Sequence, residues 1–376
     1  MTGVLGTLLP FLFVLTVVIF FHELGHYWVA RRFGVRVEVF SIGFGRTLWS
    51  RTAKSGTDWR VSMIPLGGYV RYYGDADAAS TPDLDKLNHM SVKERKESYF
   101  HQPPLARIAI AAAGPFANFA LAIVLFWGLF AFIGQVTRPA EIAAITPDSA
   151  AQAAGLEIGD KIVAIDGAPA EAFGDLRRAV ALSGGQEILL GIDRAGTALD
   201  IPVTPRWVER DDGAGGVIKG WLVGIAPPDK AQQRTFGVGE ALQKATDETW
   251  NVISGTLGYV GRMIGGTESA SGLGGPIRIA DASGDAAQYG FAALLGFTAL
   301  VSVSIGLVNL FPIPMLDGGH ILLYGIEFVR RKPLSDRTLE NSFRVGLALV
   351  AALMIFATWN DLAHYQVVDW VRDLFS

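Results

Sequence analysis

Residues 4–30 form an apolar run long enough to cross a bilayer, and a short polar motif interrupts it. The motif reads His-Glu-Leu-Gly-His, and its polar members are His22, Glu23 and His26. A charge at the centre of a membrane helix costs about 2.5 to 3.5 kcal/mol on insertion scales, so such residues are kept where function needs them. The run therefore predicts a membrane-spanning helix that carries a functional site.

The spacing of the two histidines indicates a metal site. Positions i and i+4 lie one turn apart on the same face of a helix, so His22 and His26 can bind one cation. Zinc at such a site lowers the pKa of a bound water, and Glu23 can act as general base and pass the proton to a leaving amine. The alternative is a chance match on an ordinary helix, which the apolar surroundings disfavour. A third protein ligand must come from elsewhere in the chain.

Composition is typical of a membrane enzyme. Half of the 376 residues are hydrophobic, 18% are charged and the net charge is −4. The mean hydropathy is +0.33. The slightly acidic balance argues against a nucleic-acid partner. Because the chain has no cysteine, any metal must be held by His, Asp or Glu.

Three further apolar segments can span or enter the membrane. They are residues 105–136, 289–316 and 345–359, of which the last is short unless it extends on either side. Lysines and arginines crowd the stretch between the first and second segments of the chain and the stretch between the third and fourth. The positive-inside rule places both stretches in the cytoplasm and residues from about 138 to 287 on the opposite face. This predicts a multi-pass membrane protein whose middle region lies in the periplasm if the cell has two membranes.

The middle region has the pattern of a small β/α domain. Between residues 139 and 205, short β-branched runs alternate with Gly-Asp and Asp-Gly turns around one helical piece at 173–182. Residues 154–167 resemble PDZ domains of the circularly permuted kind found in bacterial proteases. Such a domain can capture an extended peptide at a sheet edge, or it can act only as a spacer that excludes bulky substrates. The sequence leaves both possibilities open.

The third metal ligand is sought among acids forced into apolar surroundings. Asp317, His320 and Glu327 are the candidates in the third apolar segment and its extension. Prolines and glycines break the helix around Asp317, and broken backbone at membrane depth is tolerated where it lines an enclosed cavity. Glu327 lies close to a basic pair at 330–331, so a surface ion pair is expected there. His320 is expected to start a helix or support a ligand, and Asp317 ranks first.

Three motifs in order support a family resemblance. HELGH lies at 22–26, Asn-Leu-Phe-Pro-Ile-Pro at 309–314 and Leu-Asp-Gly-Gly at 316–319. With the PDZ-like region between them, they resemble the site-2 proteases, which are zinc intramembrane metalloproteases, and in particular their RseP-type regulators of sigma-E with a single PDZ domain. Some proteins of this type carry two PDZ domains, whereas this chain has room and motif for one.

The resemblance implies roles for individual residues. It implies a Zn²⁺ ion held by His22, His26 and Asp317, with Glu23 as the catalytic acid and base. It further implies substrate-positioning roles for a second set: Asn309, Pro312 and Pro314.

Two other stretches carry the resemblance. Residues 40–45 and 59–70 resemble the family's membrane-associated β-hairpin region, whose edge strand, with Gly67 and Gly68 as positioning residues, is expected to pair with unwound substrate. The alternative is an amphipathic loop that lies on the cytoplasmic leaflet in contact with membrane lipid. Residues 113–118 match a small-residue motif of the second membrane helix, which favours close helix packing over a direct role in catalysis.

The predicted fold is an α-helical polytopic membrane protein with about four transmembrane helices, a membrane-associated β-hairpin region and an inserted β/α PDZ domain. Its segments are transmembrane helix 1 with HExxH (1–33), a cytoplasmic-side membrane-associated β region (34–104), transmembrane helix 2 (105–136), a periplasmic PDZ domain (137–206), an amphipathic interfacial segment (207–288), transmembrane helix 3 with the broken LDG segment (289–332), and transmembrane helix 4 with a C-terminal tail (333–376).

The predicted function is that of a zinc-dependent metalloendopeptidase. It is expected to cleave single-pass membrane proteins, such as anti-sigma factors or signal-peptide remnants, within the bilayer after prior trimming of the outer domain. Its expected partners are transmembrane protein substrates, membrane lipid and a peptide ligand of the PDZ domain. One alternative is a membrane PDZ adaptor with a structural metal site, which a closed four-ligand zinc would indicate. Another is a CAAX-type membrane zincin acting on soluble chains, in which neither the PDZ insertion nor the LDG segment is expected.

Overall fold

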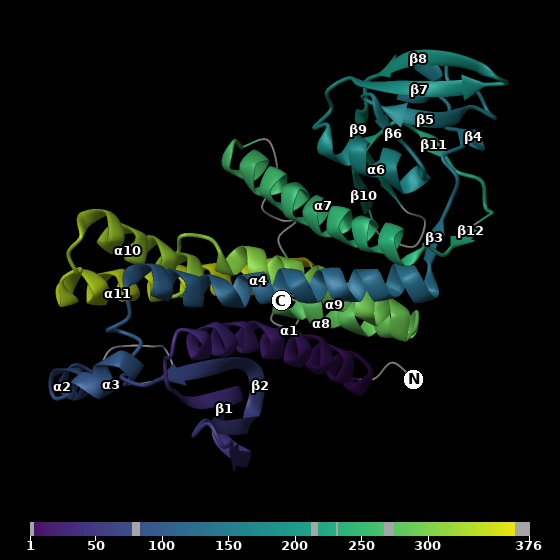
Figure 1. The fold of residues 1–376 in the computed structure, drawn as a ribbon. Coiled ribbons are helices and arrows are strands. Elements are labelled where there is room, and N and C mark those ends of the chain that lie inside the picture. Colours follow the sequence, from purple (N-terminus) through teal and green to yellow (C-terminus); the bar gives the residue numbers. More distant parts are fainter. Residues whose placement is uncertain (1–3, 77–82, 212–216, 231, 267–273, 365–376) are drawn as a thin grey trace, which may run out of the picture. The chain divides into compact units, whose positions relative to one another are not determined.

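Four described helices of the computed structural model are long and apolar enough to cross a membrane (Figure 1). They are α1 (Val4–Arg32), α4 (Pro104–Gly128), α9 (Phe291–Asn309) and α11 (Asp336–His364), and α4 continues as the π-helix η1 (Leu129–Ile133). Their number matches the four segments predicted from hydropathy. Helix α11 extends the short apolar stretch 345–359 on both sides, which gives it enough length to span a bilayer.

The chain divides into two units. Unit 1 comprises residues 1–129 and 238–376, and unit 2 comprises residues 130–237. The structure describes these ranges of the chain: 4–76, 83–211, 217–230, 232–266 and 274–364. The predicted C-terminal tail beyond residue 364 lies outside the described residues.

Helices α1, α4 and α9 of unit 1 pack against one another at small residues. A side chain at Gly25 of α1 would meet the carbonyl oxygen of Ala113 on α4, and one at Gly306 of α9 would meet the carbonyl oxygen of Pro115 at 3.0 Å. Lipid offers helices no hydrophobic drive toward one another, so their association relies on close backbone approach. The small-residue stretch 113–118 thus has the packing role expected for it.

Helix α10 (Asp317–Arg330) follows α9 after a break in which residues 310–316 form no helix. The break folds back onto the start of α10, since side chains at Gly318 and Gly319 would meet the carbonyl oxygens of Leu310 and Ile313. The two glycines after Asp317 therefore permit the break to pack closely against the start of α10. This geometry brings Asp317 out at the N-terminus of a helix.

Two other helices of unit 1 come from the segment predicted to be interfacial. Helix α7 (Val238–Ile264) is amphipathic, and α8 (Pro276–Gln288) packs against α1, α9 and α11. The buried carboxylate of Asp361 on α11 accepts the backbone N–H groups of Gly275 and Ile277 at 2.8 and 3.0 Å. It satisfies donors that a helix start leaves free, so it ties α8 to the end of α11.

A small β sheet follows α1 in unit 1. Strands β1 (Val37–Thr52) and β2 (Asp58–Tyr72) pair antiparallel, and each bends so that it pairs twice. Residues 39–42 lie between residues 58–61 on one side and 68–71 on the other. Positive φ angles at Gly43 and Gly45 accompany the bend in β1. The short helices α2 (Leu84–Asn88) and α3 (Val92–Glu97) come next.

Unit 2 is a β/α domain with its own core. Its four-stranded sheet has the order β6-β5-β7-β8, and buried Ile162, Leu190 and Val203 belong to one hydrophobic cluster with α6. Its elements are β3 (Gln135–Thr137), β4 (Ala144–Ile145), α5 (Ala150–Ala153), β5 (Lys161–Ile165), β6 (Ala168–Pro169), α6 (Phe173–Leu182), β7 (Ile188–Arg194), β8 (Thr197–Val203), β9 (Arg206–Asp211), β10 (Val217–Leu222), β11 (Ile225–Ala226) and β12 (Gln232–Arg234).

The unit extends past the predicted domain boundary at residue 206. Strand β11 pairs with β4 and β12 pairs with β3, so the chain after 206 returns to complete the start of the domain. Buried Val223 also joins the cluster of the domain core. The segment predicted as 207–288 therefore divides, with 207–237 in unit 2 and the remainder in unit 1.

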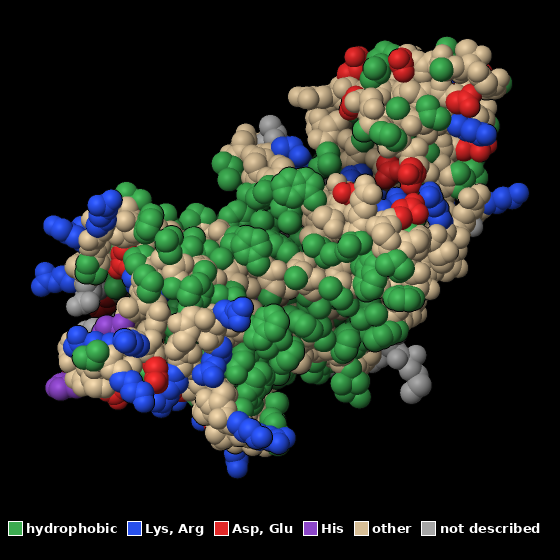
Figure 2. Space-filling model, in the orientation of Figure 1, with side chains coloured by type: hydrophobic (Ala, Val, Ile, Leu, Met, Phe, Trp, Pro, Cys, Tyr) green, Lys and Arg blue, Asp and Glu red, His purple; other side chains and the backbone are tan. Residues whose placement is uncertain are grey.

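The surface of unit 1 separates apolar from basic regions. Figure 2 shows hydrophobic side chains over α1, α4, α8 and α9, whereas lysines and arginines gather around α2, α3 and the end of α10. An apolar surface with cations gathered beyond one end is the pattern of a membrane protein.

Candidate metal centre

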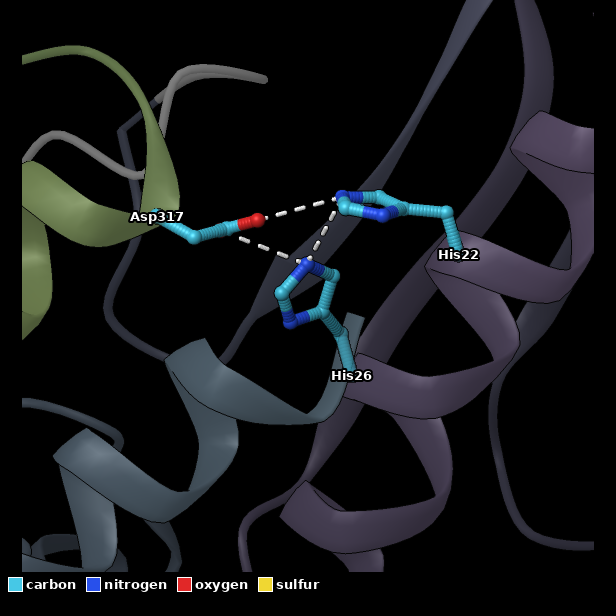
Figure 3. Close-up of side chains that lie close together, drawn as sticks. All are labelled: His22, His26 and Asp317. Carbon is cyan, nitrogen blue, oxygen red and sulfur yellow. Dashed lines mark hydrogen bonds and ion pairs between the residues drawn. The ribbon is translucent and has the colours of Figure 1, made fainter. Parts of the chain in front are cut away.

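Helices α1 and α10 bring His22, His26 and Asp317 together (Figure 3). The Nε2 atom of His22 lies 3.2 Å from Oδ2 of Asp317, and Nε2 of His26 lies 3.4 Å from Oδ1. The two Nε2 atoms are 3.3 Å apart. Among the described residues this is the one group of three His, Cys, Asp or Glu side chains close enough to share a metal.

The three groups fit a zinc ion. Ligands at about 2.0 to 2.2 Å from a tetrahedral zinc lie roughly 3.3 to 3.6 Å apart, and the observed separations of 3.2, 3.3 and 3.4 Å agree with this. Within the described part of the chain, the buried Oδ2 atom of Asp317 faces Nε2 of His22 but makes no hydrogen bond of good geometry. A buried carboxylate oxygen without a hydrogen bond is costly unless it faces a cation. The donor set of two imidazoles and one carboxylate is also one that zinc favours.

Each of the three side chains owes its position to local structure. His22 and His26 are one turn apart on α1, as their spacing predicts. Asp317 is the first residue of α10, where the preceding break lets its side chain reach back to α1. The site therefore joins two segments that are about 290 residues apart in the sequence.

Helix α4 contacts both histidine rings at their Nδ1 atoms. The Nδ1 atom of His26 lies 2.8 Å from the carbonyl oxygen of Ile110, and Nδ1 of His22 lies 3.2 Å from Nδ2 of Asn118. Between them, a side chain at Gly114 would meet Nε2 of His26. Glycine at this position therefore leaves room for the imidazole rings and a metal.

Glu23 lines the same pocket as His22, His26 and Asp317. The pocket has a volume of about 210 Å³. Strand β2 forms one wall, and a side chain at Gly68 would meet Cγ of Glu23 at 2.9 Å. Of the predicted substrate-positioning residues, Asn309 and Gly68 line the pocket, whereas Gly67, Pro312 and Pro314 do not.

Two tyrosines line the pocket that were not predicted from the sequence as site residues. Tyr72 on β2 and Tyr99 are buried, and their rings stack with centroids 4.7 Å apart. Burial raises the pKa of each phenol well above its usual value, so both stay neutral at physiological pH. In the sequence, only their place in the predicted membrane-associated β region 34–104 pointed to them.

Glu327 is not the surface residue that its neighbours in sequence suggested. It is buried, and its Oε2 accepts from Nη2 of Arg107 on α4 at 2.5 Å. The predicted pairing with the basic residues at 330–331 is therefore wrong, because the carboxylate of Glu327 pairs with Arg107 of the second apolar segment. His320 lines the pocket, and its Nδ1 lies 3.5 Å from the hydroxyl of Tyr324. It lies beside Asp317 rather than among the three ligand groups.

Comparison with known proteins places this chain in one family. The family model for Peptidase family M50 matches residues 10–353. An Agrobacterium fabrum protein whose name assigns it to the zinc metalloproteases is 43% identical over 96% of this chain and 97% of its own length. Metalloprotease MmpA of Caulobacter vibrioides is 38% identical with full coverage of both chains. Protease RseP of Yersinia pestis is 32% identical over 97% of this chain and 100% of its own.

A solved structure, the PDZ domain of the SdrC-like protein from Listeria innocua, aligns with 26% of this chain at 15% identity and a TM-score of 0.21, which is too low to assign a fold.

The family and the relatives' names confirm the predicted metalloendopeptidase activity and zinc as its cofactor. The chain therefore belongs to peptidase family M50, the family of the site-2 proteases that its motifs resemble.

Proposed function

We propose that this membrane metalloprotease cleaves single-pass membrane proteins within their bilayer segment after another protease has shortened the outer domain. The observation that carries the proposal is the meeting of Asp317 with His22 and His26, at 3.2 to 3.4 Å, where the two histidines lie on a helix apolar enough to cross a membrane. Anti-sigma factors and signal-peptide remnants are the substrate classes that fit.

In this proposal His22, His26 and Asp317 hold zinc, and Glu23 is the catalytic acid and base. When bound, zinc supplies Lewis acidity, which polarises a peptide carbonyl and makes a water more acidic. Glu23 takes a proton from the attacking water and delivers it to the departing amine as the peptide bond breaks. Three protein ligands leave a coordination position open, which supports a catalytic site over the closed site of a structural adaptor.

Substrate recognition in the proposal uses the wall formed by β2. Residues 68–71 pair with 39–42 on one side, and an unwound substrate adds as a strand on the other. Gly68 keeps this strand close to Glu23, because a side chain there would meet Cγ of Glu23, and Gly67 in the same way lets the strand lie close to Phe44 of β1. Substrate unwinding is needed because a transmembrane helix uses its own carbonyls in hydrogen bonds.

The break before α10 forms the second wall. Asn309 lines the pocket and contacts substrate in this proposal. Pro312 and Pro314 act through the shape of the break. Helix α11 packs closely against this break, because a side chain at Gly346 would meet Pro314. The PDZ-like unit lies in the periplasm of a bacterial inner-membrane protein and either binds a peptide or excludes substrates with bulky outer domains.

The test compares membrane proteomes of cells that produce wild-type protein, Glu23→Gln or the control Glu187→Gln, which replaces an exposed acid of unit 2. Truncated single-pass proteins should accumulate only with Glu23→Gln. The trapped proteins are then incubated with each purified, zinc-loaded enzyme, and mass spectrometry maps the cleavage site. Cleavage by Glu23→Gln, or cleavage outside the bilayer segment, would contradict the proposal.

A further inference from the structure

The Nδ1 atoms of both histidines face helix α4. Nδ1 of His26 lies 2.8 Å from the carbonyl oxygen of Ile110. A backbone carbonyl can only accept, so Nδ1 of His26 carries the proton and donates it. The lone pair of this ring is then on Nε2, the atom that faces Asp317 at 3.4 Å. One backbone group thus fixes the tautomer that a metal ligand needs.

The corresponding partner of His22 is a side-chain amide. Nδ2 of Asn118 lies 3.2 Å from Nδ1 of His22, and Asn118 is completely buried. Among the described residues, the Oδ1 atom of this amide has no hydrogen-bond partner. An amide that points its nitrogen at His22 requires the imidazole proton on Nε2, the atom that faces Asp317. This orientation is incompatible with a metal at Nε2.

Turning the amide by half a rotation removes the conflict. Nitrogen and oxygen of an asparagine amide have nearly the same size and shape, so the hydrogen-bond network decides which one faces a neighbour. With Oδ1 toward His22, the Nδ1–H group donates to it and Nε2 is free to bind a cation. The unpartnered oxygen then gains the donor that it lacks.

We infer that Asn118 is a positioning residue that accepts a hydrogen bond from Nδ1–H of His22 and so fixes this ring for zinc. Partners on α9 hold Asn118 in turn. The hydroxyl of Ser302 donates to the backbone oxygen of Asn118 at 2.8 Å, and a side chain at Gly306 would meet Cβ of Asn118 at 3.1 Å. The inference rests on the proposed role of His22 as a ligand.

This role is additional to helix packing. Gly25 on α1 and Gly306 on α9 allow these helices to approach α4. An apolar side chain at position 118 would serve packing equally well. A fully buried amide in an apolar bundle is unfavourable unless it forms a hydrogen bond. The partner available to the side chain of Asn118 is Nδ1 of His22, 3.2 Å away.

The experiment measures zinc affinity by competition with a chelator in purified full-length protein. Asn118→Leu keeps the size of the side chain and removes the acceptor, and it should weaken zinc binding about 10- to 100-fold. Asn118→Asp keeps the acceptor and should bind zinc at least as tightly as wild type. Cobalt-substituted protein gives a second readout, because the absorption bands of Asn118→Leu should shift and those of Asn118→Asp should stay.

Thr298→Val is the matched control. Thr298 is a buried polar residue of α9 that donates to the Leu294 carbonyl within its own helix. This variant should keep wild-type zinc affinity, and its thermal unfolding in detergent shows what loss of a buried polar group does to folding alone. Wild-type affinity in a folded Asn118→Leu protein, or an equal loss in Asn118→Leu and Asn118→Asp, would overturn the inference.

A fourth variant separates this inference from the proposed function. His22→Phe should lose zinc binding almost completely, since it removes a ligand. If His22→Phe binds zinc as tightly as wild type, the ligand assignment fails and this inference fails with it. If His22→Phe loses zinc but Asn118→Leu keeps it, only the role of Asn118 is disproved.

Discussion

Arg107 and Glu327 form an ion pair between α4 and α10, with Nη2 and Oε2 2.5 Å apart and side chains only 12% and 6% exposed. The guanidinium also lies over the ring of Tyr324, and the other carboxylate oxygen of Glu327 accepts the backbone N–H of Leu334. The pair fixes the far end of α10, the helix whose first residue is Asp317.

Removing one member of this pair should destabilise unit 1 strongly. Arg107→Met or Glu327→Leu leaves an uncompensated buried charge or unpaired donors, with an expected loss of about 3 to 5 kcal/mol. The double variant should regain much of that loss, because it buries no lone charge. Thermal unfolding in detergent measures all three, and a double variant as unstable as the sum of the single ones would contradict this explanation.

Gly114→Ala should abolish zinc binding without unfolding the protein. The new methyl group would meet Nε2 of His26 and would lie about 2.8 Å from Cε1 of His22, so the rings must move away from the metal position. Zinc content by elemental analysis checks this. Gly128→Ala on the same helix is the control, because nothing lies within 4 Å of a side chain there. Stoichiometric zinc in purified Gly114→Ala protein would disprove the crowding argument.

Gly68→Ala should lower kcat while zinc stays bound. The added methyl group would meet Cγ of Glu23 and Cγ2 of Ile19 at 2.9 and 2.8 Å, and a displacement of a catalytic group by about 1 Å can reduce the rate by about 100-fold. Parallel measurements of peptide cleavage and zinc content separate the two effects. Gly174→Ala in α6 provides a control with open space around the new side chain. Unchanged cleavage would remove Gly68 from the positioning set.

Unit 2 should lose a stabilising ion pair in acid. Nε of Arg194 donates to the buried carboxylate of Asp160 at 2.7 Å, and this hydrogen bond lowers the pKa of Asp160. A carboxyl group whose pKa is lowered by folding stabilises the protein above its unfolded pKa of about 3.9 and loses that effect as pH falls through the folded value. The stability difference between wild type and Asp160→Asn should therefore be large at pH 7 and shrink below about pH 4.

Thermal proteolysis of unit 2 in the intact chain measures this difference. Asp200→Asn, at an exposed position of β8, should show no such dependence on pH. A gap between wild type and Asp160→Asn that stays constant from pH 7 to pH 3 would contradict the assignment.

The sequence predicted the parts of the site that follow from local rules. Spacing on one helix face was enough for His22 and His26, and the cost of an acid in apolar surroundings, together with the prolines and glycines beside it, singled out Asp317. The four long helices followed from hydropathy alone. Each of these inferences uses neighbours within about one helical turn or one membrane span.

Contacts between residues far apart in the sequence could not be predicted from these local rules. Arg107 and Glu327 are 220 residues apart, and nothing local distinguishes a buried pair from two snorkelling charges. The return of β11 and β12 to the start of unit 2 moved the domain end past 206, because strand pairing depends on partners more than on propensity. The contact between Asn118 and His22 likewise needed the packed helices.

The separation of Asp317 from the two histidines sets an order of events during synthesis. A ribosome that adds about 5 to 20 residues per second needs roughly 15 to 60 s to travel from His26 to Asp317. During that interval α1 carries two of the three proposed zinc ligands and lacks the third. The proposed zinc site is therefore complete only after Asp317 has been made and the start of α10 has reached α1.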